Sequence, residues 1–430
     1  MVLEVAVTVV RAAARPDTSA ARTTRGGATI RYVSRRSRGP QIVAAVAVAS
    51  FALAACGQTG RSAGLRTPTA PHLTVSASLA ARPAQGTGHV KPTLVGLVTM
   101  GDMNWTDNPD GEPLNRLLEA STHPGVYAAA VIQATWKELE PRPGVFDDSA
   151  IQAALQRISA YNKKYPKTPL VGKLRVFPGV HSPAWVLEAV GSVRLVNHHT
   201  GTAASYPDFW KPEYSRLWTE LQDHLATVYD RNDLIGEVAV TSCSSFSGEP
   251  FNNGQGSFFD SSTLIAAGYT DTQYENCLSN AASNYAAWKL TPVDFPFNEL
   301  MLMQTHQIDS AFSIKVMAAF RKALGTRAVV ANEDFDVPLP KDLAPIYDEI
   351  QELRHQAWSA RPRELSPLEF QVLGPTIDWA AVVPAAIGTY HPTEIEVWSS
   401  TATRRPGGYA DITEAQLQRW SAELKVAAVP

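Results

Sequence analysis

Residues 126–177 decide the fold of this chain: they read VYAAAVIQA (126–134), IQAALQRISAYN (151–162) and LVGKLRVF (170–177). The first and third segments are short apolar runs, which are typical of strands. The middle segment has apolar residues three and four positions apart, which predicts an amphipathic helix. A strand, a helix and a second strand in this order form the repeating unit of a parallel α/β fold.

The same alternation continues along the chain to residue 398. Strands are predicted over 94–98, 126–134, 170–177, 235–241, 292–297, 328–331, 368–373 and 395–398, and helices over 113–120, 151–162, 214–228, 273–288, 308–324, 343–354 and 379–387. Eight strands that alternate with helices predict a (β/α)8 barrel, the TIM barrel of the α/β class. An open doubly wound sheet is the alternative. It lacks support, because no predicted strand is followed by a G-x-G-x-x-G turn or a Walker A sequence.

The composition indicates a globular protein, because 45% of the 430 residues are hydrophobic and 18% are charged. The net charge of −3 is unevenly divided: residues 1–55 hold eight basic and two acidic side chains (+6), which leaves 30 basic and 39 acidic ones (−9) for residues 56–430. An acidic body without a basic stripe argues against nucleic acid as a partner. Ten tryptophans, all from Trp105 onward, are either core residues or platforms for sugar rings.

The amino-terminal part is predicted to be an export signal over residues 1–55. A basic cluster precedes an apolar run over 42–55, which is too short to span a bilayer as a permanent helix. The basic cluster consists of Arg31, Arg35, Arg36 and Arg38. We expect translation to begin near Val33, so that the residues before it are an extension of the signal.

The apolar run ends Leu53-Ala54-Ala55-Cys56, which resembles the lipobox of bacterial lipoproteins. The resemblance implies that Cys56 is lipidated and becomes the mature N-terminus; the alternative is an ordinary cleavage site with a chance cysteine. Residues 56–92 are rich in Thr, Ser, Ala, Pro and Gly and are predicted to be a flexible tether. We therefore expect a protein on the outside of a bacterial cell that contacts the membrane through its lipid anchor only.

Cys243 and Cys277 are the remaining cysteines of the chain. In an exported protein such a pair predicts a disulfide, since neither cysteine belongs to the C-x-x-C spacing of a zinc or redox site. Residues 93–430 are expected to form the catalytic barrel, and the protein is expected to be a monomer.

The segment after the second predicted strand reads WKELEPRPGVFD (136–147). It resembles the W-x-x-x-E-P-x-x-G-x-(F/Y)-(D/N) segment of (β/α)8-barrel glycoside hydrolases, in the large retaining clan that includes β-galactosidases, cellulases and xylanases. Arg175 at the end of the third strand and SPAW (182–185) in the following loop are also similar to this clan. The resemblance covers residues 93–400. It implies a glycosidase that cleaves an oligo- or polysaccharide with two carboxyl groups and needs no metal or organic cofactor.

In this clan the acid follows strand four and the nucleophile ends strand seven. The chain has Gly248-Glu249-Pro250 where many members have Asn-Glu-Pro, so the resemblance implies Glu249 as the acid but departs at the asparagine that binds the sugar 2-hydroxyl. Glu369 in strand seven is the predicted nucleophile, because a carboxylate inside an apolar strand is costly without a role or a partner. Glu396 in strand eight is the alternative nucleophile, and Glu394 is a further candidate. The residues expected to contact the sugar are Trp136, Arg175, Trp185, Asn332, Glu333, Gln371 and Trp398.

The second function hypothesis is a non-catalytic carbohydrate-binding lipoprotein, either a transport receptor or a barrel that lacks the acid pair. Two carboxyl groups that converge in one cleft favour the enzyme, whereas two lobes joined by a hinge favour the receptor.

Overall fold

The computed structural model describes residues 89–100, 123–197, 201, 203–245, 248–251, 261–339, 341, 343–360, 367–372, 378–398 and 412–427. Of residues 100, 356–360 and 398 it describes the backbone alone. Cys56, residues 56–88 of the predicted tether and the predicted helix over 113–120 lie outside the described residues, so these expectations stay predictions. Residues 89–92 are described, and the ammonium of Lys91 donates to the carbonyls of Asn232 at 2.9 Å and Ile235 at 2.8 Å, so the chain contacts the barrel before residue 93.

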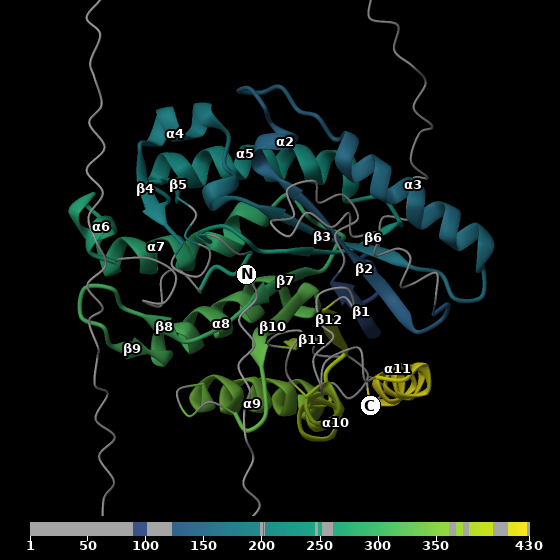
Figure 1. The fold of residues 1–430 in the computed structure, drawn as a ribbon. Coiled ribbons are helices and arrows are strands. Elements are labelled where there is room, and N and C mark those ends of the chain that lie inside the picture. Colours follow the sequence, from purple (N-terminus) through teal and green to yellow (C-terminus); the bar gives the residue numbers. More distant parts are fainter. Residues whose placement is uncertain are drawn as a thin grey trace, which may run out of the picture. The chain divides into compact units, whose positions relative to one another are not determined.

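Eight parallel strands close into a barrel in which each strand is hydrogen-bonded to the next one along the chain and the last is hydrogen-bonded to the first (Figure 1). This arrangement confirms the predicted (β/α)8 barrel, since a doubly wound sheet would have two open edges. The barrel strands are β1 (Gly96–Met100), β2 (Tyr127–Thr135), β3 (Val171–Phe177), β6 (Ile235–Ala239), β7 (Val293–Pro296), β10 (Ala328–Phe335), β11 (Leu368–Val372) and β12 (Glu394–Trp398).

Helices follow the strands along the chain and surround the barrel (Figure 1). The sequence predicts all of the following except α11. The helices are α3 (Ser149–Lys164), α5 (Pro212–Tyr229), α7 (Asp271–Ala281), α8 (Ser310–Leu324), α9 (Ala344–Ala360), α10 (Trp379–Tyr390) and α11 (Glu414–Ala427). Among the described residues, no helix combines the length and the apolar character needed to cross a bilayer.

Short elements in the connections were not predicted, because runs of two to seven residues carry little periodicity. They are α2 (Trp136–Leu139), α4 (Ala184–Val190), α6 (Ser261–Ala266), the hairpins β4 (Ser192–Val196) with β5 (Ala203–Pro207) and β8 (Leu300–Met301) with β9 (Ile308–Asp309), and three 3-10 turns over Gly179–His181, Ala282–Tyr285 and Gly325–Arg327. The prediction of a helix from residue 308 was wrong for its first two residues, which form β9. Asp309 caps α8 by accepting the backbone N–H of Phe312.

The hydrophobic core is one large cluster that unites strand and helix side chains around the barrel. Its largest fully buried members include five tryptophans, which places at least half of the chain's tryptophans in the core. They are Trp136, Trp218, Trp288, Trp379 and Trp420. A separate small cluster of Leu94, Val98, Ala129 and Val131, with Val171 packed against it, forms an apolar floor inside the barrel near the amino ends of the strands.

Asp230, at the end of α5, closes the amino side of the barrel by binding the chain that enters β7. Its carboxylate accepts the backbone N–H of Lys289 at 2.9 Å, of Leu290 at 3.1 Å and of Thr291 at 2.9 Å. We expect Asp230→Ala to lower the free energy of unfolding by about 2–3 kcal/mol, because three hydrogen bonds to the carboxyl group are lost and the N–H of Thr291 is left buried without its acceptor. Urea unfolding measures the change. The exposed Asp233→Ala should change it by less than about 0.5 kcal/mol, and equal losses in both variants would contradict this account.

Candidate active site

A cluster of charged side chains fills the barrel directly above its apolar floor. The ammonium of Lys173 on β3 lies 2.5 Å from Oε2 of Glu369, 2.9 Å from Oδ2 of Asp294 and 3.2 Å from Oε1 of Glu237. Glu394 on β12 joins the cluster, since the charge of Glu237 acts on its carboxyl group. None of these five side chains has any exposed surface. We call Lys173, Glu237, Asp294, Glu369 and Glu394 the lower cluster.

In the lower cluster, carboxyl groups with raised pKa values surround the positive charge of Lys173. Burial raises the pKa of Glu237 and of Asp294 to about 7, against the attraction of Lys173. Burial and the neighbouring carboxyl groups raise the pKa of Glu369 and of Glu394 well above the usual range, again against Lys173. Burial lowers the pKa of Lys173, but the surrounding carboxyl groups outweigh this and raise it well above its usual value. Lys173 is therefore a permanent cation and not a neutral amine nucleophile.

Three carboxyl groups of the lower cluster have the geometry of metal ligands. One oxygen from each of Glu237, Asp294 and Glu369 lies within 4.8 Å of the others. The ammonium of Lys173 contacts all three. The protein's own cation thus occupies the place that a bound cation would take.

A second layer of polar side chains lies nearer to the carboxyl ends of the strands. Arg175 comes two residues after Lys173 on β3 and therefore points into the barrel from the next layer. Its Nη1 lies 2.8 Å from Oε1 of Glu396, and its Nη2 lies 2.9 Å from Oε2 of Glu396 and 2.9 Å from Oε1 of Glu333. Gln371 on β11 completes this upper cluster by donating to the carbonyl of Glu333 at 3.2 Å.

The pKa values of the two carboxyl groups that Arg175 binds, Glu396 and Glu333, are shifted in opposite directions. Burial would raise the pKa of Glu396, but the charges of Arg175 and Lys173 hold it below its usual value. Burial raises the pKa of Glu333 well above its usual value although Arg175 opposes the rise, and the charge of Glu249 adds to it. The upper cluster therefore favours the ionised form of Glu396 and the protonated form of Glu333, the two kinds of state that acid–base chemistry requires.

The loop that carries Glu249 rests on the upper cluster. A Cβ atom at Gly248 would lie 3.2 Å from Cδ of Arg175 and 3.5 Å from Cε1 of Phe177, so the loop backbone lies directly against the arginine side chain. Glu249 is partly exposed, and its charge reaches Glu333. A side chain at position 248, such as the asparagine of the Asn-Glu-Pro pattern, would require Arg175 to shift by a few tenths of an ångström.

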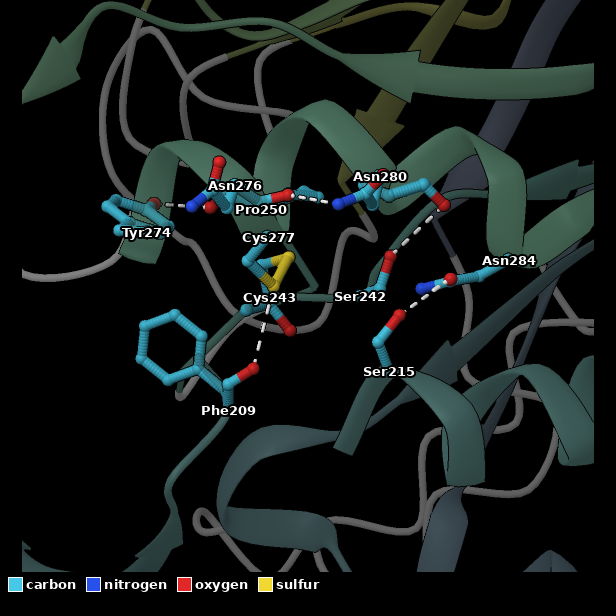
Figure 2. Close-up of a disulfide and its surroundings, with 12 residues drawn as sticks. Phe209, Ser215, Ser242, Cys243, Pro250, Tyr274, Asn276, Cys277, Asn280 and Asn284 are labelled. Atoms are coloured by element: carbon cyan, nitrogen blue, oxygen red, sulfur yellow. Dashed lines mark hydrogen bonds between the residues drawn. A yellow bond between two sulfur atoms is a disulfide. The ribbon is translucent and has the colours of Figure 1, made fainter. Parts of the chain in front are cut away.

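The other side of this loop is fastened to α7 (Figure 2). A disulfide joins Cys243, which follows β6, to Cys277 in α7, and it confirms the predicted bridge. The hydroxyl of Tyr274, one turn earlier in α7, donates to the carbonyl of Pro250 at 2.5 Å. Two independent links therefore hold the Glu249 loop in its position.

Glu369, the predicted nucleophile, lies in the lower cluster. It comes two residues before Gln371 on β11 and is thus one layer further from the strand ends, with its carboxyl group against Lys173. The assignment of Glu369 as nucleophile does not fit this position. Glu396, the alternative, lies in the upper cluster with Arg175.

Two of the expected sugar contacts, Trp136 and Asn332, lie in positions that do not fit that role. Trp136 has no exposed surface and packs edge-on against Trp185 and Trp218, so it is a core residue. Asn332 precedes Glu333 on β10 and points to the opposite face of the strand. There its amide nitrogen donates to the carbonyl of Phe297 at 2.9 Å, and its amide oxygen accepts a hydrogen bond from the hydroxyl of Tyr347.

The remaining expected sugar contacts are divided between the upper cluster and its surroundings. Arg175, Glu333 and Gln371 lie together in the upper cluster. Trp185 on α4 is partly exposed and donates its indole N–H to the carbonyl of Glu140 at 2.9 Å. Trp398 ends β12, and its side chain lies outside the described residues.

Sequence reasoning missed three members of the lower cluster: Lys173, Glu237 and Asp294. The signal was present, because each is a charged residue inside a predicted apolar strand. The cost of burying such a charge, which singled out Glu369, applies equally to them.

No family model matches the chain, and no curated protein matches it. Its fold is similar to those of three solved glycoside hydrolases. Endo-glycoceramidase II from Rhodococcus sp. is 15% identical with a TM-score of 0.42, over 77% of this chain and 81% of that one. The β-galactosidase from Rahnella sp. R3 is 12% identical with a TM-score of 0.43, over 79% and 58%. The exo-β-1,4-mannosidase Op5Man5 from Opitutaceae bacterium strain TAV5 is 10% identical with a TM-score of 0.40, over 81% and 62%. These likenesses concern the fold alone.

Gly179, after β3, supports the start of the Glu249 loop. Its φ is +57°, and a Cβ atom there would lie 2.0 Å from the carbonyl oxygen of Ser245. We expect Gly179→Ala to displace residues 244–251 and to destabilise the protein by about 1–3 kcal/mol through overpacking, in addition to the cost of a positive φ. Gly201→Ala is the matched control, because Gly201 has a φ of +69° and nothing within 4 Å of its Cβ position. Thermal unfolding and hydrogen exchange of residues 244–251 measure the difference; identical behaviour of the two variants would refute the contact.

Proposed function

We propose that this chain is a glycoside hydrolase in which Glu396 is the nucleophile and Glu249 is the general acid and base. The observation that carries the proposal is the arrangement around Arg175, which binds the carboxyl groups of Glu396 and Glu333 beneath the loop of Glu249 and favours the ionised form of Glu396. This arrangement lies at the carboxyl end of a closed parallel barrel, where the active sites of TIM barrels are found. The resemblance of residues 126–185 to barrel glycoside hydrolases supports the same activity.

The proposed reaction has two steps. In the first, the Glu396 carboxylate attacks the anomeric carbon, and the bond to the leaving oxygen breaks as Glu249 gives that oxygen its proton. In the second, a water molecule attacks the glycosyl ester, Glu249 takes the proton of the water, and the sugar leaves with Glu396 restored as a carboxylate. Arg175 orients Glu396 through two hydrogen bonds.

The rival hypothesis of a transport receptor loses support, because the described residues form one barrel and not two lobes with a hinge. A barrel that binds carbohydrate without cleaving it is an outcome of the following test.

We expect Glu396→Gln to abolish turnover of every glycoside, because the nucleophile is lost. Glu249→Gln should lower kcat/KM about 10²–10⁴-fold on natural oligosaccharides, but far less on aryl glycosides whose leaving group needs no proton. Chromogenic glycosides and plant and bacterial polysaccharides, tested with residues 57–430, measure both effects. Glu213→Gln, an exposed carboxylate on α5 paired with Arg216, is the control and should leave turnover unchanged.

Each alternative has its own signature in this test. If the wild-type protein binds sugars but cleaves none, the hypothesis of a carbohydrate-binding barrel is correct. Full activity of Glu396→Gln assigns the nucleophile to another carboxyl group of the barrel.

We further propose that the enzyme is an exported monomer, anchored outside the cell by lipid on Cys56, and acts on an oligo- or polysaccharide there. The support is the order of the basic cluster, the apolar run over 42–55 and the lipobox-like Leu53-Ala54-Ala55-Cys56.

Cys56→Ala should move the protein from the membrane fraction to the soluble fraction or stall its processing, because the thiol that receives the lipid is missing. Cell fractionation and mass spectrometry of the mature N-terminus measure this. An unlipidated N-terminus in the wild type, with unchanged fractionation of the variant, would defeat the idea.

A further inference from the structure

The lower cluster has no part in the proposed reaction, yet it contacts one residue of the upper cluster, Glu396. We propose that Lys173 and Glu369 are positioning residues for Glu396, which they hold from below as an aligned carboxylate while Arg175 holds it from above. The inference rests on the proposed function, since it takes Glu396 as the reacting carboxylate.

Glu396 is bound from both layers of the barrel interior. Its Oε2 lies 3.4 Å from Nζ of Lys173 and accepts a hydrogen bond from Nη2 of Arg175 at 2.9 Å. Glu369, 2.5 Å from Lys173, also acts on Glu396 and helps to lower its pKa. Within the described ranges, Glu396 is the one carboxylate that forms ion pairs with both cations of the barrel.

The ammonium of Lys173 lies where Glu237, Asp294 and Glu369 could hold a metal ion, but it differs from a metal ion in its charge. It carries a single positive charge among several carboxyl groups, and burial raises the pKa of Glu237, Asp294 and Glu369 against its attraction. In its protonated form, Glu369 can donate a hydrogen bond to Glu396. Glu396 is thus the carboxylate on which both cations of the barrel act.

The groups that face Glu396 determine the expected effect of removing Lys173. Among the described residues, β1 and β2 present the uncharged Val98 and Gln133 to the barrel interior. The other strands present Lys173 and Arg175 (β3), Glu237 (β6), Asp294 (β7), Glu333 (β10), Glu369 and Gln371 (β11) and Glu394 (β12). Two of these groups are cations, so losing Lys173 removes one of the two charges that stabilise the ionised form of Glu396.

The test is Lys173→Met, with Lys173→Arg as the variant that keeps the charge and the exposed Lys163→Met as the control for the substitution itself. A nucleophile that gains a proton cannot attack, so the acidic limb of the kcat/KM profile should move to higher pH by about 1–3 units in Lys173→Met. Lys173→Arg should restore most of the shift, and Lys163→Met should show none. A folded Lys173→Met with an unchanged acidic limb overturns the inference.

Where Lys173→Met fails to fold, two neutral variants at Glu369 decide the question. Glu369→Gln keeps a hydrogen-bond donor toward Glu396, whereas Glu369→Leu has none. We expect the acidic limb of Glu369→Leu to lie at higher pH than that of Glu369→Gln. Identical profiles in these two variants contradict the positioning role.

A second readout separates this inference from the proposed function. The ¹³C chemical shift of glutamate carboxyl groups reports their ionisation, and the Glu396 signal is assigned by its loss in Glu396→Gln. If the wild type cleaves no glycoside, the proposed function fails, but the titration of Glu396 in Lys173→Met or the Glu369 variants still measures their effect on it. An unshifted titration of Glu396 in these variants overturns the inference alone.

Discussion

The ion pair between Lys173 and the carboxyl groups around it is the interaction on which the interior of this barrel depends. The side chains that fill the middle of a TIM barrel are usually bulky and branched, and their packing is apolar. Here Glu237, Asp294 and Glu369 come from three strands, and a single ammonium lies against all of them. Without that cation the strands would bring uncompensated carboxyl groups together in a space that excludes water, which is strongly unfavourable.

The side chains on the outer and inner faces of the barrel strands therefore have different roles. The outer side packs against the helices in one continuous hydrophobic cluster that supplies the stability of the fold. The inner side begins with an apolar floor, continues through the lower cluster and ends in the upper cluster around Arg175. The proposed site thus lies at the end of the barrel that receives the Glu249 loop, and the lower cluster connects it to the apolar floor.

Much of the fold could be predicted from the sequence, because apolar runs and helical periodicity recur with every strand and helix. The site could be predicted less well. Glu369 and Glu396 both lie in correctly predicted strands, but the layer that each occupies depends on the register between strands, which pairs Glu369 with Glu394 and Gln371 with Glu396. Asn332 and Glu333 are neighbours in sequence, and only the alternation of the observed strand separates the core residue from the site residue.

The protons held inside the barrel also affect the conditions under which the fold is most stable. Glu237 and Asp294 have a pKa of about 7 in the folded barrel, above the usual 4.5 and 3.8 of these carboxyl groups, because burial disfavours their charge. The folded protein therefore binds these protons more tightly than the unfolded chain does. By linkage, the free energy that these two groups contribute to unfolding falls as the pH rises from about 4 to about 7. Mild acid weakens many proteins by protonating ion-paired carboxylates, whereas Glu237 and Asp294 in this barrel already favour the protonated form.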